Sequence, residues 1–175
     1  PSSARQSLTD LATAHWPFHD RLAPIPIDEI RGILKPHADV SKVVAGPAFV
    51  IPDTQMGLNA VAITPKNAHL CCEMSPSVVD DVIDEQPCFA VFLDGKAVSI
   101  CTTVRRSPHA AEAGLDTHED HRGKGYALEV TSAWAKATRQ QGRLPLYSTS
   151  WDNAASQRVA EKLNAIHYAC DFRLQ

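Results

Sequence analysis

The sequence predicts a mixed α/β fold, in which a mostly antiparallel central sheet is flanked by helices. Extended runs at 88–93 and 96–104 are joined by Asp94-Gly95, a dipeptide typical of two-residue hairpin turns. A third extended run at 111–117 continues these two into an antiparallel meander. Helical patterns follow at about 126–141 and at 153–163, and further extended runs at 144–150 and 167–174. We expect the helices to cover the sheet.

The first half of the chain predicts shorter elements. Apolar residues at helical spacing indicate two helices, over 2–15 and 27–34. Short extended runs indicate two strands, at 48–51 and 60–63. Ser75-Pro76 is a typical helix start, and the helix after it should bury an apolar face made of Val78, Val79, Val82 and Ile83. No motif in this half carries chemistry.

Length and composition exclude several classes of protein. At 175 residues, 44% apolar and 21% charged, the chain is typical of one globular domain, 1–175. Its net charge of −3 argues against a nucleic-acid partner, and no apolar run approaches the roughly 20 residues that span a membrane. Five cysteines without a C-x-x-C pair indicate reduced thiols, so we expect a cytoplasmic protein.

A glycine-rich turn stands between the third strand of the meander and the long helix. The start of a helix attracts anions, because its first N–H groups are free and its dipole adds about half a positive charge. Gly123 and Gly125 permit close approach of a phosphate to the backbone, and Arg122 and Lys124 add charge. Spacing excludes a P-loop, which needs Ser or Thr after Lys124, and a dinucleotide fingerprint, which needs glycine at Leu128. A plain helix-start turn is the alternative.

Two motifs resemble those of the GNAT N-acetyltransferase superfamily. Arg122-x-x-Gly125-x-Ala127 matches its signature Q/R-x-x-G-x-G/A, and the segment 147–163 is similar to its second conserved block. The resemblance covers 86–175, whereas 1–85 looks like a variable substrate-side segment. It implies the GNAT fold, with a sheet split where acyl-CoA enters. It also implies an enzyme that transfers an acetyl or short acyl group from CoA to an amine, by direct attack in a ternary complex and without a metal.

The resemblance also assigns a binding role to particular residues. Those implied at the pyrophosphate of acetyl-CoA form the turn and the helix start: Arg122, Gly123, Lys124, Gly125, Tyr126 and Ala127. The main chain of Leu115 and Thr117 is implied to hold the pantetheine arm. Asn153 is expected to cap the second helix, with Ser156 at its third position, and the resemblance implies that it also contacts the cofactor.

The catalytic residues are less clearly marked. Glu112 lies near where several family members place a catalytic glutamate, and Gly114 should leave space beside its carboxylate. Counting across the preceding turn sets Arg105 opposite Glu112, so a structural ion pair is the alternative to a general base. Many family members carry a general-acid tyrosine seven residues after the asparagine, where this chain has Ala160. Tyr168, a water molecule or no dedicated acid must then serve.

The sequence leaves the acceptor unnamed. A small-molecule or peptide amine is implied by the resemblance, and the chain is expected to act as a monomer or a homodimer. The missing tyrosine keeps a second function open, a non-catalytic acyl-CoA-binding or regulatory module on the same fold.

Overall fold

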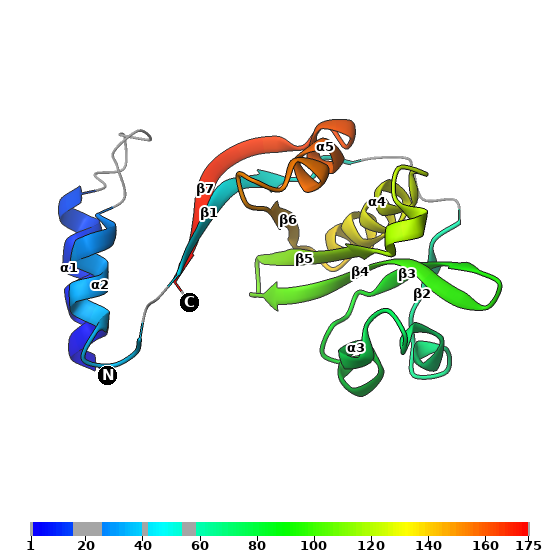
Figure 1. Cartoon of the computed structure of the whole chain (residues 1–175), viewed down its shortest axis with the longest axis horizontal. Coiled ribbons are helices and arrows are strands. Elements are labelled where there is room, and N and C mark those ends of the chain that lie inside the picture. The colour runs from blue at the N-terminus through cyan, green and yellow to red at the C-terminus, as the bar shows by residue number, and fades with distance from the viewer. Residues whose placement is uncertain (1, 16–25, 40–41, 54–58, 175) are drawn as a thin grey trace. The chain divides into compact units, whose positions relative to one another are not determined.

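The computed structural model describes residues 2–15, 26–39, 42–53 and 59–174 (Figure 1). The chain divides into two compact units, one formed by Pro1–Ala45 with Ala169–Gln175 and the other by Gly46–Tyr168. The first unit contains α1 (Ser2–His15) and α2 (Ile27–Leu34), which confirm both predicted helices. All residues of the predicted site belong to the second unit.

In the described part of the chain, seven strands form one sheet in the order β2-β3-β4-β5-β6-β1-β7. Their bounds are β1 (Val43–Val50), β2 (Val61–Ala62), β3 (Phe89–Leu93), β4 (Lys96–Arg106), β5 (Ala110–Thr117), β6 (Leu144–Ser148) and β7 (Ile166–Leu174). The pairs β1–β6, β2–β3, β3–β4 and β4–β5 are antiparallel, and β5–β6 is parallel. The predicted mixed, mostly antiparallel sheet is therefore confirmed.

The predicted hairpin turn is confirmed by its backbone angles. Asp94 and Gly95 both have positive φ, 50° and 77°, and Leu93 pairs with Lys96 across them. This left-handed conformation at both central residues matches the twist of the flanking strands.

Helices cover both faces of the meander (Figure 1). The long helix α4 (Tyr126–Gln140) lies on one face, and η1 (Ala68–Cys71) and α3 (Pro76–Asp81) lie on the other. Because β4 is enclosed between them, its residues 97–103 are all buried. Trp134 of α4 is fully buried and donates a hydrogen bond from Nε1 to Thr103 Oγ1 at 3.0 Å. This contact fixes the helix, and with it the glycine turn, on the sheet.

The predicted apolar face of α3 is only half right. Val78 and Val82 are buried, whereas Val79 is partly exposed and Ile83 is mostly exposed. The helix ends at Asp81, so Val82 and Ile83 lie in the turn that follows and do not continue the helical stripe.

The remaining elements agree closely with the predicted ones. α5 (Ala154–Lys162) begins directly after Asn153, as expected. β1 starts earlier than predicted, and β6 ends at Ser148. Within the described ranges, no helix combines the length and the hydropathy needed to cross a membrane.

Candidate functional site

Strands β5 and β6 run side by side only at their beginnings. Their parallel pairing starts at Ala110 with Leu144 and ends at Glu112 with Leu146. Beyond that point β5 continues to Thr117 along β4, while β6 stays paired with β1. A gap therefore opens in the sheet after Glu112.

The main chain of β5 presents hydrogen-bonding groups to this gap. The His118 N–H donates to the carbonyl of Val98 in β4, at 2.9 Å. Because direction alternates along an antiparallel strand, the N–H and C=O groups of Leu115 and Thr117 point away from β4 and toward the gap. These are the two residues predicted to hold the pantetheine arm.

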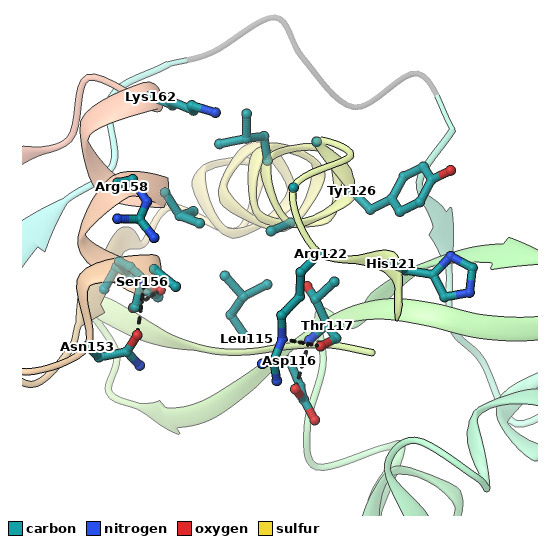
Figure 2. A pocket seen from close by; sticks show the side chains of 17 residues that line it. Leu115, Asp116, Thr117, His121, Arg122, Tyr126, Asn153, Ser156, Arg158 and Lys162 are labelled. Carbon is teal, nitrogen blue, oxygen red and sulfur yellow. Dashed lines mark hydrogen bonds between the residues drawn. The ribbon is translucent and has the colours of Figure 1, made fainter. Parts of the chain in front are cut away.

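Both main-chain groups of Thr117 already have partners. Asp116 Oδ1 accepts a hydrogen bond from the Thr117 N–H at 2.7 Å. Arg122 follows η2 (Glu119–His121), and its Nε donates to the Thr117 carbonyl at 3.2 Å. Figure 2 shows the Arg122 side chain turned toward the end of β5. A ligand that accepts a hydrogen bond from the Thr117 N–H would displace Asp116 Oδ1, whereas the Thr117 carbonyl has a second lone pair beside the bond from Arg122.

The glycine turn leaves the start of α4 open. Gly123 and Gly125 have φ of +77° and +91°, in the left-handed region that favours glycine. The N–H groups of Tyr126 and Ala127 precede the first intrahelical hydrogen bond, which Leu128 donates to the Gly125 carbonyl. No described side chain caps this helix, and a Cβ added at either glycine would meet no atom within 4 Å. An anion can therefore reach the helix N-terminus.

A pocket of about 510 Å³ lies between β5, the glycine turn and α5 (Figure 2). Eight of the nine predicted cofactor-binding residues line it: Leu115, Thr117, Arg122, Gly123, Gly125, Tyr126, Ala127 and Asn153. The ninth, Lys124, is exposed on the turn. Asn153 Oδ1 accepts a hydrogen bond from the Ser156 N–H at 3.0 Å, which confirms the predicted helix cap.

Two cationic residues of α5 also line the pocket. Arg158 and Lys162 are four residues apart and therefore share one face of the helix. Figure 2 shows both side chains on the α5 side of the pocket, with Arg122 on the other. Neither is paired with a carboxylate among the described residues. Neither residue was predicted from the sequence, although their spacing after Asn153 was a usable signal.

Tyr147 is a third lining residue that the sequence analysis missed. It lies on β6, and only 4% of its surface is exposed. Its hydroxyl forms a hydrogen bond with the Ser156 hydroxyl of α5. Burial raises the pKa of Tyr147 to about 12, so the hydroxyl keeps its proton at neutral pH. In the sequence, Tyr147 belongs to an ordinary strand pattern, and nothing in that pattern indicates that its side chain lines a pocket.

Glu112 is held by two partners at the closed end of the gap. Arg105 Nη2 lies 2.6 Å from its Oε2, and the Ser148 hydroxyl donates to its Oε1 at 2.6 Å. Arg105 and Glu112 are direct register partners, which confirms the predicted cross-strand pair. The space expected at Gly114 is filled, because a Cβ there would lie 2.3 Å from Val104 Cγ1. That expectation was wrong, because a bulge in β4 at residues 103–105 alters the alternation of side chains.

The other candidate catalytic groups lie away from the pocket lining. Tyr168 is on β7, 46% exposed, and is not among the lining residues. Ala160, at the position where the family resemblance implied a tyrosine, is fully buried in α5.

The order of these elements has a counterpart in known sequences. The family model described as GNAT acetyltransferase matches residues 80–168, slightly more than half of the chain. The chain belongs to the GNAT acetyltransferase family. The match begins before β3 and ends at Tyr168, so it includes the meander, the glycine turn and α5. Among curated proteins, none matches this GNAT chain.

Solved structures agree with the family assignment. A GNAT-family protein of Novosphingobium aromaticivorans is 18% identical, with a TM-score of 0.60 over 77% of this chain and 64% of its own. A GCN5-related N-acetyltransferase-like protein of Streptococcus suis is 17% identical, with a TM-score of 0.61 over 82% and 66%. An acetyltransferase of the GNAT family from Colwellia psychrerythraea is 15% identical, with a TM-score of 0.55 over 83% and 61%. These likenesses establish the GNAT fold, and this chain spans less than two thirds of each protein's length.

Proposed function

We propose that this GNAT protein is an enzyme that transfers an acetyl or short acyl group from coenzyme A to an amine, by direct attack in a ternary complex. The pocket carries the proposal, because it joins an open helix N-terminus to the outward main-chain edge of β5. A ligand with a diphosphate at one end and an amide-containing arm at the other matches both features.

Different residues of the chain bind different parts of the acyl donor. The N–H groups at the start of α4 face the diphosphate, and Arg122 adds a positive charge beside it. Leu115 offers its main-chain N–H and C=O to the amides of the pantetheine arm, and Thr117 offers its carbonyl, and its N–H once Asp116 Oδ1 moves away. Asn153 holds the first turn of α5 against the pocket and lies within reach of the donor.

Glu112 is the proposed general base. Aminolysis of a thioester needs a neutral amine, and a positioned carboxylate can take the proton that the ammonium loses. Glu112 lies at the last β5–β6 pair, where the gap closes, and its two partners hold the carboxylate in place. The same contacts support its competing role as a structural partner of Arg105.

An amine panel tests the proposed reaction. Acetyl-CoA is mixed with the protein and with polyamines, amino sugars or short peptides, and free thiol is measured with a chromogenic disulfide. A blank without amine is required, because Cys72 and Cys170 are exposed and react with the reagent. We expect thiol release with at least one amine, and mass spectrometry should find that amine acetylated.

The panel also separates this function from the second candidate. Calorimetric binding of acetyl-CoA with no acetylated amine would favour a non-catalytic acyl-CoA-binding or regulatory module. No binding of acetyl-CoA at all would contradict both functions.

A further inference from the structure

Tyr147 lies where the gap between β5 and β6 closes. The last parallel pair is Glu112 with Leu146, so Tyr147 is the first β6 residue beyond the paired segment. Side chains alternate along a strand, and Ser148 is bonded to Glu112. Tyr147 therefore points to the opposite face, where its hydroxyl meets Ser156 of α5. One end of the gap thus has a carboxylate on one face of the sheet and a phenol on the other.

The surroundings of this hydroxyl are suited to proton donation. Tyr147 and Ser156 both line the pocket, so a ligand in the pocket lies against them. A phenol is protonated at neutral pH, and because burial raises the pKa of Tyr147 to about 12, its proton donation requires the phenolate to be stabilised as the C–S bond breaks. Ser156 can donate its own hydroxyl proton to the Tyr147 oxygen when the phenol gives its proton away. The pair is next to the N-terminus of α5, whose dipole stabilises negative charge nearby.

In the proposed orientation of the acyl donor, its sulfur lies at the closed end of the gap between β5 and β6. The diphosphate faces the start of α4, and the arm then runs along β5 past Thr117 and Leu115. The arm therefore ends at the closed part of the gap, beside Tyr147. Tyr168 does not line the pocket, and Ala160 has no polar group to offer.

We propose that the Tyr147 hydroxyl donates a proton to the sulfur of the acyl donor as the C–S bond breaks, with Ser156 supporting the phenol. This inference rests on the proposed function. The amine nitrogen forms the new C–N bond, and the electron pair of the broken C–S bond stays on sulfur. The phenol proton converts that sulfur to a thiol. A proton lost by the amine nitrogen restores the phenol through solvent, so the products are an amide and free CoA.

Tyr147→Phe tests the assignment, because it removes the hydroxyl and keeps the packed ring. With the best amine of the panel, we expect kcat to fall about 10²-fold or more, the usual effect of a positioned acid–base group. The calorimetric Kd of acetyl-CoA should stay within about threefold, since the hydroxyl acts when the bond breaks. Ser156→Ala should lower kcat less than Tyr147→Phe. If kcat fell in Tyr168→Phe and stayed unchanged in Tyr147→Phe, the assignment would be overturned.

A second measurement needs no amine. A hydroxyl that faces the sulfur should favour a bound thiolate, because hydrogen bonds to charged acceptors are the stronger ones. The affinity of CoA relative to desulfo-CoA should therefore rise from pH 7 to pH 10 by about tenfold in the unmodified protein, since a free thiol titrates near pH 8.5. The rise should disappear in Tyr147→Phe. Desulfo-CoA lacks the sulfur but keeps the phosphates, so taking the ratio of the two affinities removes the pH effects on groups that bind the phosphates.

The two experiments distinguish the possible failures. If the protein acetylates amines and Tyr147→Phe does so equally fast, only the role of Tyr147 is wrong. If the CoA preference is independent of pH, or persists in Tyr147→Phe, the hydroxyl does not face the sulfur and the inference fails. If the unmodified protein binds neither CoA nor desulfo-CoA, the proposed function fails together with it.

Discussion

Replacing Glu112 by glutamine asks whether its carboxylate moves a proton or only joins β4, β5 and β6. The glutamine keeps an oxygen that can accept the Ser148 hydroxyl and loses the ion pair with Arg105. The Arg105 side chain is 54% exposed, so water can solvate its charge, whereas the Glu112 side chain is only 11% exposed. We therefore expect Glu112→Gln to cost about 1–2 kcal/mol of the free energy of unfolding. For a chain of this size, that lowers Tm by about 2–8 °C.

The kinetic effect separates the two roles far more clearly than stability does. A lost general base should lower kcat by about 10²–10⁴-fold near neutral pH, equivalent to about 3–5 kcal/mol of barrier. The loss should shrink at high pH, where the amine loses its proton unaided. The Kd of acetyl-CoA should hardly change, because Glu112 does not line the pocket.

Arg105→Gln is the matched control, since it breaks the same ion pair and leaves the carboxylate in place. If Glu112 is the base, this variant should keep kcat within about tenfold of the unmodified protein. Thermal unfolding and steady-state rates from pH 6 to pH 10 are measured for both variants. Equal and small kinetic effects, with the same pH profile, would refute the base and leave Glu112 as a structural partner.

The remaining predictions concern the pocket and the core. Gly125→Val should abolish acetyl-CoA binding in calorimetry while circular dichroism stays unchanged, because a branched side chain would occupy the open space before α4 that the diphosphate needs and would strain a backbone with a φ of +91°. The double variant Arg158→Gln/Lys162→Gln should weaken acetyl-CoA about tenfold at low salt and less at high salt, whereas Lys136→Gln, exposed on α4, should not. An unchanged Kd would show that these two cations do not contribute to binding acetyl-CoA. Burial raises the pKa of Cys88 to about 12, so alkylation of the folded protein at pH 8 should modify the exposed thiols and spare it; prompt labelling of Cys88 would contradict its burial.

Features that depend on a short stretch of sequence could be predicted. The turn at Asp94-Gly95 needs a positive φ at both residues, and this local requirement identified the hairpin and its register. The same counting placed Arg105 opposite Glu112. The glycine turn was recognisable because the positive φ of Gly123 and Gly125 favours glycine, and because two glycines before a helix start leave its N–H groups open to an anion.

Features that depend on how strands separate were not predictable. Tyr147 faces the pocket because β6 leaves β5 after Glu112, and no local pattern indicates where parallel pairing ends. The filled space at Gly114 likewise follows from a bulge in β4. In both cases tertiary pairing, and not propensity, decides which side chains meet.

The site also depends on a residue outside the two family motifs. A Cβ at Gly46 would lie 1.8 Å from the Thr149 carbonyl oxygen, so only glycine lets β1 approach the chain that leaves β6. The Thr149 N–H donates to the Pro47 carbonyl at 3.2 Å and secures this approach. β1 thereby fixes where β6 ends and turns into α5, which is what brings Tyr147 to Ser156. The motifs supply the phosphate-binding turn, but β1 positions the proposed proton donor, so the chemistry of this pocket needs both halves of the sequence.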